Sequence, residues 1–542
     1  MQGVLVDIAG KCAGAAQTLA LEFRVRCNEV NLTIDKSSSE PAYEQISRQI
    51  EELVAQGLLG PGARIPSIRQ LAQRLGLANS TVAIAYDELA ARRVIETRRG
   101  SGTFIAAEVD APKDIDLGTR KGNGHSGEAT REARPMNWEK YFFGSDFFGM
   151  PVGAKNQKLI RFTQAYPDPT LFPLERIKQV SASMLWTPQS FFFDSANPQG
   201  YQPLVEHIEK EMALSGVPMA AGQNDVILTG GFQRALSLLI DYLVRDGQKV
   251  AIEAPCFTQL LNLLIAKRVG YVPIPVDGQG MDTDYLAGVL ARGEVSAVIT
   301  IPTFHNPTGV CMSRERREHL LRLAEQHRVP IIEDDWGRLL RYEGEDDRPL
   351  KALDDGGHVI HIGSFSKCLL PGLRIGWITC PSAISRQLLR AKLGADNSDS
   401  QFLQALLFNF IEGSHFHRHI RHTVKQYKKR RDAMCDTLAR SLPAGCRYRQ
   451  PQGGFSVWLE LPAHLRSMPL LRLARERGVD LFPAAFMMPD RHDTNALRLC
   501  FSRLDEHENK RGTQILCEVI GDAMSKPELL QGGFQQYEDL YT

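Results

Sequence analysis

The sequence has no long apolar segment and no cysteine pairing pattern. No run of apolar residues reaches the roughly 18 to 20 that a membrane-spanning helix requires. The ten cysteines are scattered and form no C-x-x-C pair, which argues against a zinc ribbon, a disulfide framework or any other metal site. The first residues, MQGVLVDIAGKC, lack the basic start of a signal peptide. We therefore expect reduced thiols and a cytoplasmic location.

An excess of either charge is also absent. The formal net charge is +1, so a nucleic-acid site would have to be a local feature of the chain. The 542 residues are 43% hydrophobic and 23% charged, which is the composition of an ordinary globular protein with several domains.

Four regions follow from composition and periodicity. Residues 1–38 form an unassigned N-terminal extension, and residues 39–107 form a helical unit that ends in a hairpin. Residues 108–158 are poor in large apolar side chains before an aromatic stretch at 136–150, and we read them as a linker. In residues 159–542, short apolar runs alternate with helix-length segments, which predicts an α/β domain with helices on both faces of a sheet.

The second region has the order of a winged helix-turn-helix, an α+β fold. Ile46, Ile50 and Leu53 lie at helical spacing, and Ser67 and Gly76 suit the N-cap and the end of a short second helix. A third helix starts near NSTV, and VIETRRGSGTFIA reads as two short strands around a glycine-rich turn. Helix, short turn, helix and hairpin is the order of DNA-binding winged helices.

The local charge agrees with DNA binding. Between residues 64 and 99 there are seven arginines and only three acidic residues, which is the footprint expected of phosphate binding. A basic run alone is more often a solvated face. Here it accompanies the ordered helices and hairpin, and Ser80 and Thr81 open the third helix, where polar groups reach phosphates and base edges.

This segment resembles the GntR family of DNA-binding domains through PAYEQI, GARIPSIRQLAQRLG, STV and YDELAARRVIETRRGSGTF. The resemblance implies a DNA-binding face, with Arg98 and Arg99 on the turn of the wing. Asn79 stands where the family usually has an arginine, and an amide reads adenine more naturally than guanine. The residues expected at DNA are Arg64, Ser67, Arg69, Asn79, Ser80, Thr81, Arg98, Arg99 and Gly102.

A lysine in the last region has the setting of a reactive amine. Lys367 follows the apolar run VIHIGSFS, and an amine desolvated in such a turn can form a Schiff base. Arg374, Ser364 and Ser366 lie nearby and offer the donors that a phosphate requires. Gly230 and Gly231 precede a predicted helix, whose N-terminus is a natural anion site.

Three other motifs complete the requirements of pyridoxal 5′-phosphate (PLP). Asp334 ends the strand IIED and would face the pyridine nitrogen, Asn306 in HNPTG would donate to the 3-oxygen, and Phe257 in EAPCF would stack on the ring. Each motif alone is more often an ordinary turn or strand end. Their occurrence together predicts a PLP site.

These motifs resemble the class I aminotransferases, which have the α/β PLP-dependent transferase type I fold. The resemblance runs from YPDPTLFP through NPQGY, LTGGFQRAL, HNPTG, IIEDDWG and SFSKCLLPGLRIGW to NALRLCFS. It implies that Lys367 is the catalytic Schiff-base lysine and that Arg498 clamps a substrate carboxylate. Trp336 stands where relatives have a tyrosine that contacts the cofactor's 3-oxygen, and Val205 where they have an arginine. An indole donates one hydrogen bond but cannot replace a phenol in proton transfer.

Together the two halves resemble the MocR/GabR family of transcriptional regulators. That resemblance implies a domain-swapped homodimer that binds operator DNA and senses an amino compound through the Lys367 aldimine, or senses PLP itself. Two alternatives remain open at this stage: a working aminotransferase with an accessory DNA-binding domain, and a scaffold that has lost the cofactor.

Overall fold

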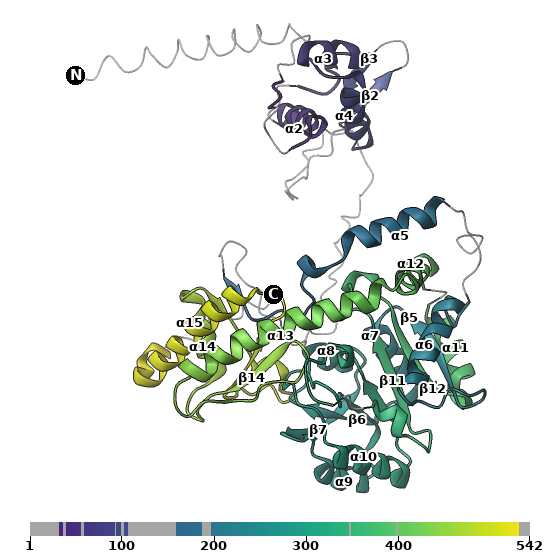
Figure 1. Ribbon diagram of the computed structural model, residues 1–542, viewed down its shortest axis with the longest axis vertical. Coiled ribbons are helices and arrows are strands. Elements are labelled where there is room, and N and C mark those ends of the chain that lie inside the picture. The colour runs from purple at the N-terminus through teal and green to yellow at the C-terminus, as the bar shows by residue number, and fades with distance from the viewer. Residues whose placement is uncertain are drawn as a thin grey trace, which may run out of the picture. The chain divides into compact units, whose positions relative to one another are not determined.

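In this computed structural model, the chain divides into two compact units, residues 1–135 and 136–542. The structure describes residues 32–35, 40–55, 59–92, 94–98, 102–106, 159–186, 197–345, 348–396 and 399–530. Most of the N-terminal extension, the 108–158 linker, its aromatic stretch and Arg99 lie outside these ranges. Figure 1 shows the helices and strands of both units.

The described residues of the first unit form three helices and a small antiparallel sheet, which is the predicted winged helix-turn-helix. Its helices are α2 (Ala42–Ala55), α3 (Ile68–Leu75) and α4 (Asn79–Ala91), and its strands are β1 (Arg64–Ile65), β2 (Ile95–Arg98) and β3 (Gly102–Ile105). The strand order is β1-β3-β2. The sequence predicted the β2–β3 hairpin but not β1, which is only two residues long.

The ends of α3 follow from the residues that flank it. The Ser67 hydroxyl accepts a hydrogen bond from the Gln70 amide, and the side-chain oxygen of Gln70 accepts one from the Ser67 amide, which forms a capping box. Gly76 ends the helix in the left-handed conformation, with φ of 64°. Both predicted boundaries of this helix are confirmed.

The core of the first unit extends beyond its predicted N-terminal boundary. Ile46 and Ile50 of α2 pack with Leu71 of α3 and Leu89 of α4. Leu32 is buried in the same cluster, and the side chain of Gln49 bonds the backbone of Thr33. A boundary at residue 39 therefore leaves out four residues that pack on this unit.

The second unit is built on an eight-stranded mixed sheet with the order β5-β12-β11-β10-β9-β6-β7-β8. β7, β6, β9, β10 and β11 run parallel, and β12 and β8 run antiparallel to them. β5 pairs antiparallel with β12 and therefore runs in the same direction as the five. These strands are β5 (Asn224–Thr229), β6 (Lys249–Ala254), β7 (Gly270–Asp277), β8 (Gly280–Met281), β9 (Val295–Thr300), β10 (Ile331–Asp334), β11 (Val359–Ser364) and β12 (Gly376–Pro381).

Helices cover both faces of this sheet, which explains why its central strands are continuously apolar. Ile252, Ile299 and Ile332 pack under α7, α8 and α11, whereas the alternate residues Val298 and Ile331 pack under α9 and α10. The helices of the unit are α5 (Leu174–Trp186), α6 (Gln202–Leu214), α7 (Phe232–Leu243), α8 (Thr258–Ala266), α9 (Thr283–Ala291), α10 (Arg314–His327), α11 (Ser382–Ala395), α12 (Gln401–Glu412), α13 (His415–Ser441), α14 (Ser467–Glu476) and α15 (Glu506–Ser525).

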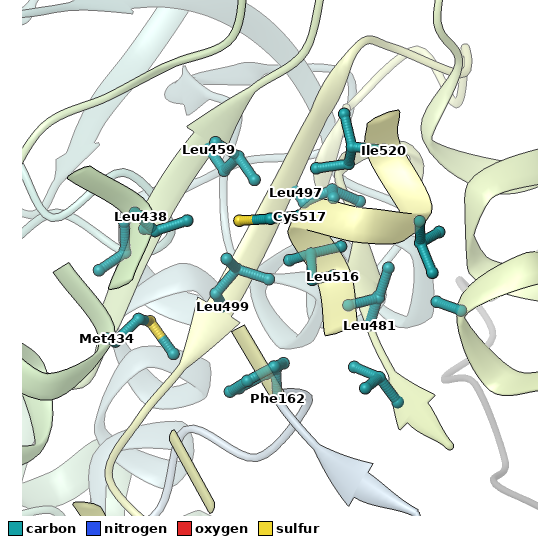
Figure 2. Packing of buried hydrophobic residues seen from close by; sticks show 14 of the residues in the cluster. Phe162, Met434, Leu438, Leu459, Leu481, Leu497, Leu499, Leu516, Cys517 and Ile520 are labelled. Atoms are coloured by element: carbon teal, nitrogen blue, oxygen red, sulfur yellow. The ribbon is translucent and has the colours of Figure 1, made fainter. Parts of the chain in front are cut away.

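The C-terminal part forms a second layer around a smaller antiparallel sheet of order β13-β14-β17-β16. Figure 2 shows its core, in which Leu459 of β14 and Leu497 and Leu499 of β17 lie against Leu516 of α15 and Leu438 of α13. The remaining strands are β4 (Ile160–Arg161), β13 (Arg447–Tyr448), β14 (Ser456–Glu460), β15 (Val479–Asp480), β16 (Phe482–Pro483) and β17 (Ala496–Cys500). No helix among the described residues is long and apolar enough to cross a membrane.

Candidate functional site

The parallel strands bring the predicted site residues to one edge of the large sheet. Asp334 ends β10 and Ser364 ends β11, while Phe257 and Asn306 follow β6 and β9. Carboxyl ends of parallel strands lie at the same edge, where ligands of such sheets bind. A cavity of about 160 Å³ opens there. It is lined by Ala165, Tyr166, Phe232, Gln233, Phe257, Gln259, Asn306, Asp334, Trp336, Ser364, Ser366, Lys367, Pro371, Arg374, Phe455 and Ser456.

Lys367 holds its amine inside this cavity. Its Nζ donates a hydrogen bond to the Ala165 carbonyl at 2.8 Å and lies 4.0 Å from the centre of the Tyr166 ring. Burial is the main cause that lowers the pKa of the amine to about 8, and the positive charge of Arg498 lowers it further. A substantial fraction of this amine is therefore neutral near physiological pH, which is the nucleophilic form.

Asp334 is a buried carboxyl group that lacks a cation to balance it fully. Burial raises its pKa well above the usual range, and the neighbouring carboxylates of Asp335 and Glu253 add to this effect. Its Oδ1 atom has no hydrogen-bond partner among the residues that the structure describes. A protonated ring nitrogen placed at this oxygen would satisfy both the hydrogen bond and the charge.

Donors for an anion gather at the N-terminus of α7. A Cβ atom added to Gly231 would lie 3.1 Å from the Arg374 guanidinium carbon, so that side chain lies against the residue that caps α7. The next two residues, Phe232 and Gln233, line the cavity. Gly230 faces elsewhere, because a Cβ atom added to it would lie 3.2 Å from Asp399 Oδ1. The helix N-terminus and the guanidinium together suit a phosphate group.

Arg498 on β17 forms a hydrogen bond with Asn306, which lines the cavity. It is 7% exposed, and it donates hydrogen bonds to the Thr163 carbonyl at 3.0 Å and to Asn306 Oδ1 at 3.4 Å. Its Nε atom has no partner within the described part of the chain. The Asn306 amide therefore keeps its NH₂ group for another acceptor, and Arg498 keeps a donor for a ligand.

The cavity walls contain two further unpaired donors. The indole nitrogen of Trp336 and the hydroxyl of Ser366 are buried and have no hydrogen-bond partner among the described residues. The Trp336 ring lies 5.6 Å from the ring of Phe455, which also lines the cavity. Trp336 thus offers one hydrogen bond at a wall that is otherwise aromatic.

Sequence reasoning missed several of the lining residues. Tyr166, Gln233, Phe455 and Ser456 line the cavity. Tyr166 and Gln233 lie within the motifs YPDPTLFP and LTGGFQRAL, but no role was predicted for them, and neither Phe455 nor Ser456 was singled out from the sequence. Sequence reasoning also missed a buried His305–Glu253 pair next to Asn306. His305 Nε2 lies 3.3 Å from Glu253 Oε2, and His305 Nδ1 forms a hydrogen bond with the Thr308 hydroxyl. Glu253 in turn accepts from the Thr300 hydroxyl and the Ile301 amide, so this network fixes the loop that presents Asn306.

The residues present fit PLP. The unpaired Asp334 oxygen, the Arg374–α7 anion site and the neutral Lys367 amine match the ring nitrogen, the phosphate and the aldehyde of the cofactor. When bound, PLP supplies an electron-withdrawing ring. The protein's own part would be to hold a proton at the Asp334 oxygen, to exclude water with Phe257, Trp336 and Phe455, and to present the amine of Lys367.

The predicted DNA-binding residues lie on the exposed side of the first unit. Arg64, Ser67, Arg69, Asn79 and Ser80 are exposed, and Thr81 is half-buried at the start of α4. A Cβ atom added to Gly102 would lie 3.0 Å from Arg64 Nε, so the base of the wing and this arginine lie together. Arg98 ends β2, but its side chain, like the whole of Arg99, lies outside the described residues.

Comparison with known proteins agrees with both units. Residues 192–516 match the family "Aminotransferase class I and II", and residues 42–105 match "Bacterial regulatory proteins, gntR family". The chain is 33% identical to aromatic-amino-acid aminotransferase 1 of Thermococcus litoralis, over 73% of this chain and 97% of the relative. It is 27% identical to the "Probable rhizopine catabolism regulatory protein MocR" of Rhizobium meliloti, over 83% of this chain and 88% of the relative.

Solved structures match the second unit. The kynurenine aminotransferase of Pyrococcus horikoshii, in complex with PMP, aligns with a TM-score of 0.65 and 32% identity, over 68% of this chain and 92% of that chain. LysN of Thermus thermophilus, complexed with N-(5′-phosphopyridoxyl)-L-leucine, aligns with a TM-score of 0.64 and 27% identity, over 72% of this chain and 100% of that one. PLP is thus the cofactor of this fold. The chain belongs to the aminotransferase class I and II family and, because a gntR-family DNA-binding domain precedes that fold, it is a fusion regulator of the MocR type.

Proposed function

We propose that this regulator senses a small amino compound, or PLP itself, at Lys367 and converts the binding into a change of DNA affinity. The observation that carries the proposal is that Lys367 lies close enough to Arg498 for the positive charge of Arg498 to act on its amine. The amine has a pKa lowered to about 8, and the guanidinium keeps an unpaired, buried Nε atom. Lys367 would hold PLP, whose aldehyde carbon reacts with amines, beside the carboxylate-binding Arg498, and this combination suits an amino acid or a similar compound.

Each site residue has a distinct role in this proposal. Lys367 is the catalytic residue and reacts with the cofactor's aldehyde, and Arg498 binds the effector's carboxylate. Asp334 faces the ring nitrogen, Asn306 and Trp336 face the 3-oxygen, and Phe257 covers the ring. The remaining cofactor contacts lie at the phosphate and are Gly230, Gly231, Ser364, Ser366 and Arg374. Gly230 has the weakest support among them, because a Cβ atom added to it would point toward Asp399.

The allosteric step requires that the effector bind two conformations of the large unit unequally, because a ligand can shift an equilibrium only by its differential affinity.

We further propose a domain-swapped homodimer. The C-terminal end of α5 supports an association, since Leu185 and Trp186 are 65% and 86% exposed there. Large apolar side chains exposed together are typical of surfaces that a partner covers.

The same site could sustain transamination, and the 33% identity with an aminotransferase favours keeping that second candidate. The two functions differ in what happens after an amino compound binds. A sensor holds the compound, whereas an enzyme releases a keto acid and needs a second substrate to restore its cofactor.

The test is an absorbance titration of the purified, cofactor-loaded protein with amino compounds, read together with DNA affinity. Sensing predicts a spectral shift that saturates with one class of amine, persists without turnover and changes the dissociation constant for DNA. Steady keto acid formation with unchanged DNA affinity would establish the enzyme instead. A Lys367→Ala variant serves as the control, because it retains the fold but lacks the reactive amine.

A further inference from the structure

Helix α13 carries an unusual concentration of positive charge. Its first 17 residues, from His415 to Arg431, contain seven lysines and arginines and four histidines but no acidic residue. The whole chain has a formal net charge of only +1, so this is a local feature. Figure 1 shows α13 as a single long helix that runs from α12 toward α15 on the C-terminal layer.

Three of the seven cations on α13 form ion pairs with carboxylates of the protein. Arg430 bonds Asp168 at 2.6 Å, and the fully buried Arg431 bonds Glu343 at 2.8 Å. Lys428 lies 3.2 Å from Glu343 and 3.4 Å from Asp432. Asp432 is the first acidic residue of the helix, and it is held by Lys428 and Arg431. These contacts explain three of the seven cations as structural.

The other four cations form an exposed row, which we call the basic stripe: Arg418, Arg421, Lys425 and Lys429. Their spacing of three or four residues places them on one face of the helix, with the exposed His417 and His422 beside them. Among the residues that the structure describes, none of the four forms an ion pair.

A solvated helix surface in this chain normally carries charges of both signs. Arg314 on α10 and Arg472 on α14 each bond a glutamate four residues later, and Arg48 on α2 does the same. The basic stripe lacks such partners and instead places like charges four residues apart, which destabilises a helix. A polyanion bound along the stripe would compensate for that repulsion.

We propose that the basic stripe binds the phosphates of double-stranded DNA, as a second DNA contact outside the gntR-family unit. The inference rests on the DNA-binding function proposed for the first unit. The stripe extends over about 17 Å, from the helical rise of about 1.5 Å per residue. A DNA duplex carries one charge per about 1.7 Å, so it offers several phosphates over that length. Lysine and arginine side chains suit contact with the DNA backbone, which is independent of sequence.

The experiment compares full-length, cofactor-loaded proteins on a generic duplex of about four helical turns, or roughly 40 base pairs. The stripe variant carries Arg418→Gln, Arg421→Gln, Lys425→Gln and Lys429→Gln. Its matched control removes four exposed cations from helices with mixed charge, through Arg314→Gln, Arg322→Gln, Lys510→Gln and Arg511→Gln. The measured quantity is the slope of log K against log salt concentration.

The stripe variant should lose up to about 3.6 from the magnitude of that slope, since each phosphate contact contributes about 0.9. The control should keep the parent slope. A stripe variant that binds DNA like the control would overturn the proposal, and so would one that instead loses binding to vesicles of anionic phospholipid. Retained visible absorbance of the cofactor verifies folding, and the single variants Arg418→Gln and Lys429→Gln, each expected to lose about 0.9, replace the quadruple variant if it does not fold.

A parallel Arg69→Ala variant separates this inference from the function on which it rests. If Arg69→Ala weakens binding and the stripe variant does not, only the stripe proposal fails. If neither variant changes the affinity, the DNA-binding face of the first unit is misplaced as well, and both proposals fail.

Discussion

The reactivity of Lys367 should follow its lowered pKa. The amine combines with the aldehyde of PLP only in its neutral form, so the rate of cofactor uptake reports the fraction of neutral amine. The structure lowers the pKa of this amine from 10.5 to about 8, chiefly by burial. Because a lysine loses its charge as the pH rises, the uptake rate should rise about tenfold per pH unit below pH 8 and level off above it.

The magnitude can be stated at a single pH. At about pH 7.5, a group with a pKa of about 8 is roughly one quarter neutral, whereas a lysine with the ordinary value is about one thousandth neutral. The amine should therefore react about 200 times faster than an exposed lysine of equal intrinsic nucleophilicity.

Removal of the positive charge in Arg498→Gln takes away the second cause of the lowered pKa and should move the midpoint of the pH profile upward. Asp334→Asn removes a charge that raises the pKa and should move it downward.

The assay is stopped-flow absorbance after mixing cofactor-free protein with PLP at a series of pH values. Lys367→Ala should lack the fast phase, and its residual rate gives the contribution of other lysines. A profile of the parent that continues to rise toward pH 10 would refute the reasoning. Opposite shifts in the two charge variants are the sharper criterion, because burial alone would leave both midpoints unchanged.

Four further outcomes are expected. Asp334→Asn should weaken cofactor retention on dialysis by about tenfold or more, because a charged hydrogen bond contributes about 1.5–3 kcal/mol. Because burial raises the pKa of Asp334 in the folded protein, the native state loses stability as the pH rises above about 4, the pKa of this carboxyl in the unfolded chain. Asp334→Asn removes this loss, so it should raise the melting temperature of the cofactor-free protein at neutral pH. Arg498→Gln should raise the dissociation constant of an amino acid by about 10- to 100-fold and leave that of the matching amine without a carboxylate unchanged, as measured by spectral titration. Arg69→Ala should lower the magnitude of the salt slope of DNA binding by about 1, as measured by fluorescence anisotropy, and an unchanged slope would contradict the placement of the DNA-binding face.

The winged helix was predictable because its signals are local. The capping box of Ser67 and Gln70 and the left-handed Gly76 each follow from residues within one turn. The packing of Leu32 was not predictable, because it depends on a surface of α2 that forms only in the folded unit. The short strand β1 has no sequence signal, because two residues cannot show a period of two.

The site was predictable where a motif and the strand order act together. Asp334, Ser364 and Lys367 follow apolar runs, and parallel strands bring their ends to one edge. Tyr166 was not predictable, since its place beneath the Lys367 amine depends on a contact across 201 residues of sequence. The direction that Gly230 faces also depends on tertiary structure, through Asp399.

The energetics of the site limit what its ligands can do to DNA binding. A shift between two conformations from 1:99 to 99:1 requires a difference in binding free energy of about 5.5 kcal/mol. A carboxylate held by Arg498 alone contributes about 1.5–3 kcal/mol, of which only the part that differs between the conformations counts. PLP would engage the Asp334 oxygen, the Arg374 site at α7 and the Lys367 amine at once under the proposed function, so its binding would have the larger free energy available. An amino compound that acts as the signal must therefore gain additional contacts with its side chain, and these contacts must differ between the two conformations.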